Sequence, residues 1–173
     1  MKKIIIIILL FIVNGCSAPL VFPNEQEPFV EYEFGAYGPG LIYNLYPKVI
    51  TLYGSGRASI STPLDEELGI DEQAPHTYEF EVGIEDIKSL KNVIEDSNFF
   101  SLPADISERD VLDGGYQYLT IHLEDKSHTV GGSNPDNETL SIISEHILKL
   151  LPDGVLESFD KEITEYQRGK GFR

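Results

Sequence analysis

Two β-hairpin signals constrain the fold of this chain more than any other feature of its sequence. In each, a short turn separates two segments in which apolar and polar residues alternate. Gly54-Ser55-Gly56 lies within 49–62, and Asp125-Lys126 lies within 116–130. Successive side chains of a strand point to opposite faces of its sheet. The pattern therefore predicts antiparallel strands that each bury one face.

The alternation also predicts the register of the first hairpin. If all three residues of the Gly54-Ser55-Gly56 turn form the loop, Leu52 pairs with Ala58. The same loop pairs Ile50 with Ile60, so that apolar residues share one face. Because burial decides register, this longer loop is predicted over a two-residue loop.

Other segments predict the remaining elements. Alternation predicts further strands at 29–36 and 77–82, and a short strand is expected at 41–46, ending at Pro47. Apolar residues at helical spacing predict three helices: one whose stripe begins at Ile84 and which stops near Ser97-Asn98; a second that ends before Pro152; and 155–166. The acidic segment 63–75 is predicted to be an exposed loop.

Two local signals refine the helices. Asn134 is predicted to cap the second helix, with Pro135 at its first position, because Asn is a common cap and proline suits that position. Phe99 and Phe100 follow the first helix, and at least one of them is predicted to close the core beneath it.

Strands thus come as hairpins and helices come late. This order predicts an α+β fold, a mostly antiparallel sheet of hairpins with two to three helices packed on one face. The chain of 173 residues suits a single domain. We expect this domain over 29–166, followed by a basic flexible tail over 167–173.

The start of the chain carries a targeting signal. Lys2-Lys3 precedes an unbroken apolar run over 4–13, and the small Gly15 precedes Cys16. A membrane-spanning helix needs about 20 apolar residues, so this run is too short to be one. It predicts a secretory signal peptide over 1–15.

The only cysteine follows directly on the small residue, and this arrangement resembles the lipobox of bacterial lipoproteins. The resemblance implies cleavage before Cys16 and a diacylglyceryl group on its thiol; an ordinary signal peptide is the alternative. Ser17 at the next position resembles the signal for the outer membrane, facing the periplasm. The proline-containing segment 16–28 is predicted to be the lipidated tether.

Charge and cysteine content narrow the class of protein. The chain has 13 Lys+Arg against 29 Asp+Glu, a formal net charge of -16. Nucleic-acid binding draws on clustered Lys and Arg side chains, so no nucleic-acid partner is expected. One cysteine excludes a disulfide framework and a multi-cysteine metal site, and no cofactor is predicted.

Three stretches follow one another along the chain. The first is the hairpin 49–57, and the second is the helix with its exit, 90–103. The third begins at Asp113-Gly114-Gly115 and continues through a strand and a hairpin to Asn134-Pro135. In this order they resemble a family of uncharacterised bacterial lipoprotein domains, described as a domain of unknown function, over roughly residues 41–151. The resemblance implies a place in the cell envelope and no established activity. Members of that family often carry cysteines near the first strand, and this chain has none there.

Acidic residues gather in one segment, where Asp105, Glu108, Asp110 and Asp113 lie close together. Carboxylates are preferred ligands of Ca²⁺, so these four are weak candidates for a metal site. Their spacing does not fit an EF-hand, and solvated loop charge is the simpler interpretation. No catalytic motif occurs, and no catalytic residue is assigned.

His122 and His128 lie on opposite arms of the second hairpin. A two-residue Asp125-Lys126 turn pairs His122 with Thr129 and puts His128 on the other face. A three-residue turn that includes Glu124 would pair the two histidines. The tighter turn is the commoner one, so the histidines are predicted to lie apart.

These patterns predict a lipid-anchored protein of the bacterial cell envelope. It is expected to be non-catalytic and to bind another envelope protein or support an envelope assembly, because its tyrosine-rich strands suit a binding surface. Two alternatives are an envelope hydrolase that uses carboxylates on a glycan-type substrate and a calcium-dependent binding module.

Overall fold

The computed structural model describes residues 19–37, 46–67, 69–108 and 114–171. The strands are β1 (Pro28–Tyr37), β2 (Lys48–Tyr53), β3 (Arg57–Ser61), β4 (Thr77–Glu81), β5 (Gly114–His122) and β6 (Ser127–Ser133). The helices are α1 (Ile84–Asp96), α2 (Glu138–Lys149) and α3 (Val155–Gly169), with a 3₁₀ turn, η1 (Phe99–Ser101), after α1.

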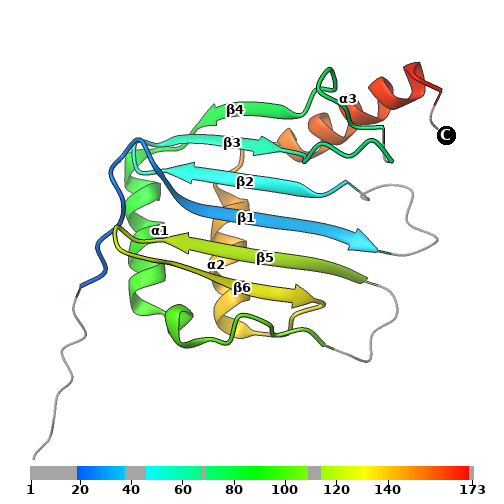
Figure 1. The fold of residues 1–173 in the computed structure, drawn as a ribbon. Helices are drawn as coiled ribbons and strands as arrows, with labels where there is room; N and C mark the ends of the chain where they lie inside the picture. The colour runs from blue at the N-terminus through cyan, green and yellow to red at the C-terminus, as the bar shows by residue number, and fades with distance from the viewer. Residues whose placement is uncertain (1–18, 38–45, 68, 109–113, 172–173) are drawn as a thin grey trace, which may run out of the picture.

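The six strands form one antiparallel sheet in the order β4-β3-β2-β1-β5-β6. Figure 1 shows α1 and α2 behind this sheet, while its other face is turned to the viewer. Residues of all three helices and of the sheet belong to one apolar core. The predicted α+β class, an antiparallel sheet with helices on one face, is confirmed.

Strand β1 joins the two hairpin units. It pairs with β2 on one side and with β5 on the other. Val30 of β1 therefore lies between Leu52 and Ile121, and all three side chains are fully buried. The alternation predicted for this strand is confirmed, because Tyr32 is buried on the same face while Glu31 is only half-buried on the other.

The predicted register of the first hairpin is confirmed, with Leu52 opposite Ala58 and Ile50 opposite Ile60. Gly56 closes this turn with a φ of 90°. A Cβ atom at this glycine would also come within 2.6 Å of a backbone carbonyl oxygen. The turn thus requires glycine both for its conformation and for its close approach to the backbone at Val82.

Helix α1 buries Ile87, Leu90 and Ile94 as predicted, but Ile84 is 47% exposed. The expectation that Ile84 begins the buried stripe is wrong because its side chain lies against Gly56, which has no side chain to cover it. After the helix, Phe99 is fully buried in the core and Phe100 is half-buried against it. The expectation that at least one of these rings closes the core is confirmed.

Helix α2 begins at Glu138, three residues later than predicted. Its N-cap is Asn137, whose Oδ1 accepts a hydrogen bond from the Leu140 N–H at 3.1 Å. Asn134, the predicted cap, has a φ of 45° and accepts a hydrogen bond from the Gly115 N–H at 2.9 Å instead. Asn134 therefore ties β5 to the end of β6 and does not cap the helix.

Two predicted surface segments contribute to the folded body. Within 63–75, Ile70 is fully buried and Ala74 is nearly so, and the loop is closed by paired backbone hydrogen bonds between Asp65 and Ile70. Helix α3 continues to Gly169, and Gln167 is buried, so a flexible tail that begins at residue 167 is wrong. The predicted strand 41–46 falls mostly outside the described residues, and Tyr46 itself is not in a strand.

Candidate functional site

The face of the sheet without helices is the candidate binding surface, and we call it the open face. Apart from Val49, its side chains are polar or aromatic, and none is fully buried. They include Glu31, Glu33, Thr51, Tyr53, Arg57, Ser59, Glu79, Glu81, Tyr118, Thr120, His122 and Thr129. Tyrosine and arginine are enriched in protein interfaces, so this composition suits contact with another protein.

A polar network joins β1, β5 and β6 on the open face. The His122 ring lies between two partners, with Nε2 at 3.2 Å from the Glu31 carboxylate and Nδ1 at 2.8 Å from the Ser127 hydroxyl. Next to it, the hydroxyls of Thr120 and Thr129 are 2.9 Å apart. These contacts hold side chains of β1, β5 and β6 in place, which lowers the entropy lost when a partner binds.

Two tyrosine rings lie over strand glycines on the open face. Tyr116 is opposite Gly35, and Tyr118 is opposite Gly131. A Cβ atom at either glycine would lie 2.7 Å from a ring carbon of its tyrosine. The glycines thus let the rings pack down on the sheet, and the Tyr118 residue remains 40% exposed.

The two histidines lie on opposite faces of the sheet, as predicted, but the pairing differs from the prediction. His122 is opposite Ser127 and not opposite Thr129, because the turn lies one residue earlier than predicted: the Leu123 N–H donates to the Lys126 carbonyl oxygen at 2.7 Å, which leaves Glu124 and Asp125 as the turn. His128 is on the helix side, where its Nε2 lies 2.9 Å from the Leu102 carbonyl oxygen.

The acidic candidates for a metal site have other contacts. Asp105 Oδ1 accepts hydrogen bonds from the N–H and the hydroxyl of Ser107, at 3.0 and 2.6 Å. The Glu108 N–H donates to a carbonyl oxygen of β6 at 2.9 Å, and its side chain is exposed. Asp110 and Asp113 lie outside the described residues. Within the described ranges, no three His, Cys, Asp or Glu side chains come together as a metal site.

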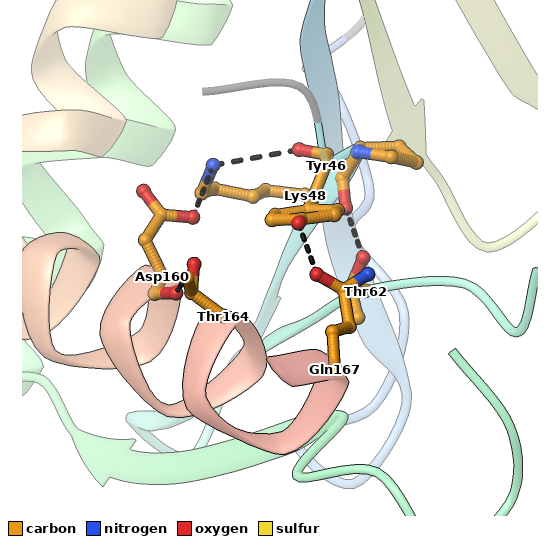
Figure 2. Close-up of polar contacts among 7 residues, drawn as sticks. Tyr46, Lys48, Thr62, Asp160, Thr164 and Gln167 are labelled. Atoms are coloured by element: carbon orange, nitrogen blue, oxygen red, sulfur yellow. Dashed lines mark hydrogen bonds and ion pairs between the residues drawn. The ribbon is translucent and has the colours of Figure 1, made fainter. Parts of the chain in front are cut away.

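A buried ion pair lies on the helix side of the sheet (Figure 2). Lys48 shares this side with Ile50 and Leu52 and is only 3% exposed. Its Nζ lies 2.8 Å from Asp160 Oδ1 on α3 and donates to the Tyr46 carbonyl oxygen at 3.4 Å. The Asp160 oxygen is buried and has no aligned hydrogen bond, so the lysine charge is what stabilises it.

Further polar contacts fix the chain before Lys48 to its surroundings, as Figure 2 shows. The Tyr46 hydroxyl donates to Gln167 Oε1 on α3. The Thr62 hydroxyl donates to the Pro47 carbonyl oxygen at 2.5 Å. The Tyr46 hydrogen bond and the ion pair attach the start of β2 to the last helix, and the Thr62 hydrogen bond attaches it to the end of β3.

A hollow of about 230 Å³ lies beside this ion pair, lined by Phe34, Gly35, Ala36, Lys48, Leu156 and Asp160. Pockets for small molecules commonly measure about 300–1,000 Å³, so this hollow is small for such a ligand. Lys48 and Asp160 also compensate each other's charge. We therefore interpret the pair as a structural contact that positions α3.

Lys48 is not among the residues predicted from the sequence, although a signal for it is present. Lys48 is in phase with Ile50 and Leu52, so strand alternation places it on the buried face. A lysine at such a position requires a buried counter-charge. Nothing in the local sequence identifies Asp160, more than a hundred residues away, as that partner.

A second polar contact holds the 63–75 segment against α3. The Tyr166 hydroxyl donates to Asp71 Oδ1 at 2.5 Å, and Lys170 forms an ion pair with the other carboxylate oxygen. The pKa of Asp71 is lowered to about 2, mainly by the hydrogen bond from Lys170 and next by the hydrogen bond from Tyr166. The same contact raises the pKa of Lys170.

The sequence matches no family model, and no curated protein is similar to it. The resemblance over 41–151 therefore stays a prediction. Cys16, the predicted lipidation site, lies outside the described residues. Among the helices that the structure describes, none is both long and apolar enough to span a bilayer.

Replacement of Asp160 by alanine should leave the Lys48 ammonium buried without a counter-charge. We expect Asp160→Ala to lower the free energy of unfolding by about 3–5 kcal/mol, measured by urea denaturation. The double variant Lys48→Met/Asp160→Leu should recover most of this loss. Glu165→Ala, which removes an exposed pair with Lys161 on the same helix, is the control and should cost under about 1 kcal/mol. Equal losses of unfolding free energy in Asp160→Ala and Glu165→Ala would contradict the assignment of a buried Lys48–Asp160 ion pair.

The Asp71 contact should make stability depend on pH in the acid range. The folded-state pKa of about 2 lies below the ordinary value of 3.8, so the contact stabilises the fold above that value. Its contribution is lost as the pH falls toward 2. The stability difference between the native chain and Asp71→Asn should thus be present at neutral pH and vanish near pH 2. Glu72→Gln, at the exposed neighbouring residue, should show no such pH dependence.

Proposed function

We propose that this protein is a lipid-anchored protein of the bacterial cell envelope, attached through Cys16 to the outer membrane and facing the periplasm. Its role is to bind another envelope protein, without catalysis. The observation that carries the proposal is the open face, a broad sheet surface of polar and aromatic side chains left uncovered by the helices. Such a surface combines pre-positioned hydrogen-bonding groups with exposed tyrosine, as protein interfaces do.

The segment 19–27, which we call the strap, supports the anchored arrangement. It crosses the end of the sheet where the β2–β3 turn and the β5–β6 connection lie, as Figure 1 shows in blue at the left. Its Val21 carbonyl oxygen accepts a hydrogen bond from the Glu124 N–H at 2.8 Å. Its Glu25 carbonyl oxygen accepts one from the Ser55 N–H at 3.1 Å. The strap is thus bonded to both hairpins.

Apolar contacts add to these hydrogen bonds. Leu20 and Phe22 pack against the core, and the Phe22 ring meets the Phe29 ring edge to face at 5.8 Å. Lys91 Nζ lies 5.0 Å from the centres of both rings, and burial lowers the pKa of this lysine. In its described part, the segment 16–28 therefore lies against the body, unlike the tether that was predicted.

A docked strap has a consequence for a lipid on Cys16. Only residues 16–18 separate that lipid from the strap, so the anchor holds the strap end of the sheet toward the bilayer. The strands then point away from the membrane, and the open face is accessible from the side. The acidic body, with a formal charge of -16 for the whole chain, is also repelled by anionic headgroups.

Replacement of Cys16 tests the anchor. Cys16→Ser removes the thiol that carries the lipid, so the protein should leave the membrane fraction or remain unprocessed. Ser17→Ala is the matched control and should stay in the membrane fraction. Mass spectrometry of the native protein should find a diacylglyceryl-modified Cys16 at the mature N-terminus. An unmodified N-terminus elsewhere would disprove the anchor.

Photo-cross-linking tests the binding function of the open face. A benzoylphenylalanine at Tyr118, which is 40% exposed, should form a discrete cross-link to another envelope protein in the native host. The same group at Ile142, which is 51% exposed on the helix side, is the control and should not trap that protein. Equal yields at both positions would contradict a specific role for the open face.

A further inference from the structure

The two edges of the sheet are built differently. The outer edge of β6 is covered by the segment 104–108. The Gly131 N–H donates to the Ala104 carbonyl oxygen at 3.0 Å, and the Ile106 N–H donates to the Gly131 carbonyl oxygen at 2.9 Å. For β4, the strand at the top of the sheet in Figure 1, the described residues make no backbone hydrogen bond to the outer side.

The register shows which groups of β4 point outward. The Thr62 N–H donates to the His76 carbonyl oxygen at 3.0 Å, and the Val82 N–H donates to the Gly56 carbonyl oxygen at 2.8 Å. Even-numbered residues of β4 therefore turn their backbone groups toward β3. In an antiparallel ladder, the odd-numbered residues between them turn theirs away.

The outward residues are Thr77, Glu79 and Glu81, and their backbone groups form a template for one more strand. No residue of β4 is fully buried: Phe80 is half-buried, and the other four residues are exposed. Tyr78 is 48% exposed, and its ring stacks on Phe80 at 6.4 Å.

The two faces of β4 carry different chemistry. Glu79 and Glu81 lie on the open face, and neither carboxylate pairs with another described residue. Arg57, which is opposite Glu81, lies over the Tyr53 ring at 3.8 Å instead. On the helix side, the Tyr78 ring remains exposed.

We propose that β4 is a docking edge for an extended basic segment of the protein partner, which adds to the sheet as a seventh strand. This inference rests on the proposed binding function and specifies its partner. Basic side chains of the added strand lie beside Glu79 and Glu81, because opposite charges attract across strands. The alternate side chains are apolar and lie beside Tyr78 and Phe80. The recognised sequence therefore alternates basic and apolar residues.

A second copy of this chain is a poor occupant of the same edge. Two-fold antiparallel pairing of β4 with itself, centred on Glu79, would put the two Glu79 side chains opposite each other on one face. Like charges directly opposite are destabilising. The net charge of -16 adds a general repulsion between copies, whereas it attracts a basic segment.

Peptide binding to the purified full chain tests the proposal. The probe is a fluorescently labelled seven-residue peptide of alternating lysine and valine. Its binding is measured by fluorescence anisotropy at low salt. Two derivatives carry backbone N-methyl groups, one on every lysine and the other on every valine. Only one of these sets of N–H groups can face β4, so one derivative should bind at least about tenfold more weakly than the other. Equal binding of both, or no binding of the parent peptide, would overturn the proposal.

Charge variants separate edge docking from general attraction. Glu79→Lys/Glu81→Lys should weaken peptide binding at least about tenfold. Glu157→Lys/Glu162→Lys changes the net charge equally at exposed positions of α3 and should have a much smaller effect. Equal loss in both double variants would show that only net charge attracts the peptide. Hydrogen exchange should meanwhile slow at the amides of Thr77, Glu79 and Glu81 when the peptide binds.

Cross-linking separates failure of this proposal from failure of the proposed function. Benzoylphenylalanine at Tyr78, which matches Tyr118 in chemistry and exposure, is compared with the same group at Tyr118 in the native host. A protein trapped from position 118 but never from position 78 would overturn docking at β4 and leave the binding function intact. The absence of any trapped protein from both positions would overturn both proposals.

Discussion

The pairing of β1 with strands on both sides is the interaction on which the rest of the structure depends. β2, β3 and β4 follow one another as a meander, and β5 and β6 form a separate hairpin, so only β1 makes them one sheet. Its buried Val30 and Tyr32 set the helix side for the neighbours on both sides. A shift of one residue in β1 would turn these side chains to water and bring Glu31 into the core. The strap leads directly into this strand, so its attachment to both hairpins supports the same register.

The last helix is held differently from the first two. α1 and α2 pack through fully buried stripes of Ile and Leu, whereas α3 combines Phe159 and Ile163 with polar contacts to the start of β2. Apolar burial has no direction, and it permits a helix to slide along the sheet. The buried Lys48–Asp160 pair has one favourable position, because any displacement leaves a charge without its partner. We infer that this pair specifies where α3 lies more than it adds to stability.

Local periodicity predicted the parts of the fold that burial alone decides. The register of the first hairpin and the buried residues of α1 follow directly from where apolar residues recur. The predicted start of α2 is wrong because Asn134 and Asn137 both precede the helix. Only the tertiary contact of Asn134 with Gly115 distinguishes the two residues. The strap, the end of α3 and the Lys48 pair were missed for the same reason. Each depends on a contact with residues far away in the sequence, which no local pattern encodes.

The described part of the acidic segment that suggested a metal site, residues 104–108, covers one edge of the sheet. Residues 104–108 pair with β6, and Gly132, whose φ is 144°, leaves the space that Ser107 occupies. One edge is thus closed by the chain's own backbone, through conformations that require glycine. The other edge has only glutamates to discourage unwanted pairing. A backbone cover excludes every added strand, whereas carboxylates exclude acidic and identical strands and favour basic ones. The sheet therefore has one edge closed to all partners and one edge that selects among them by charge.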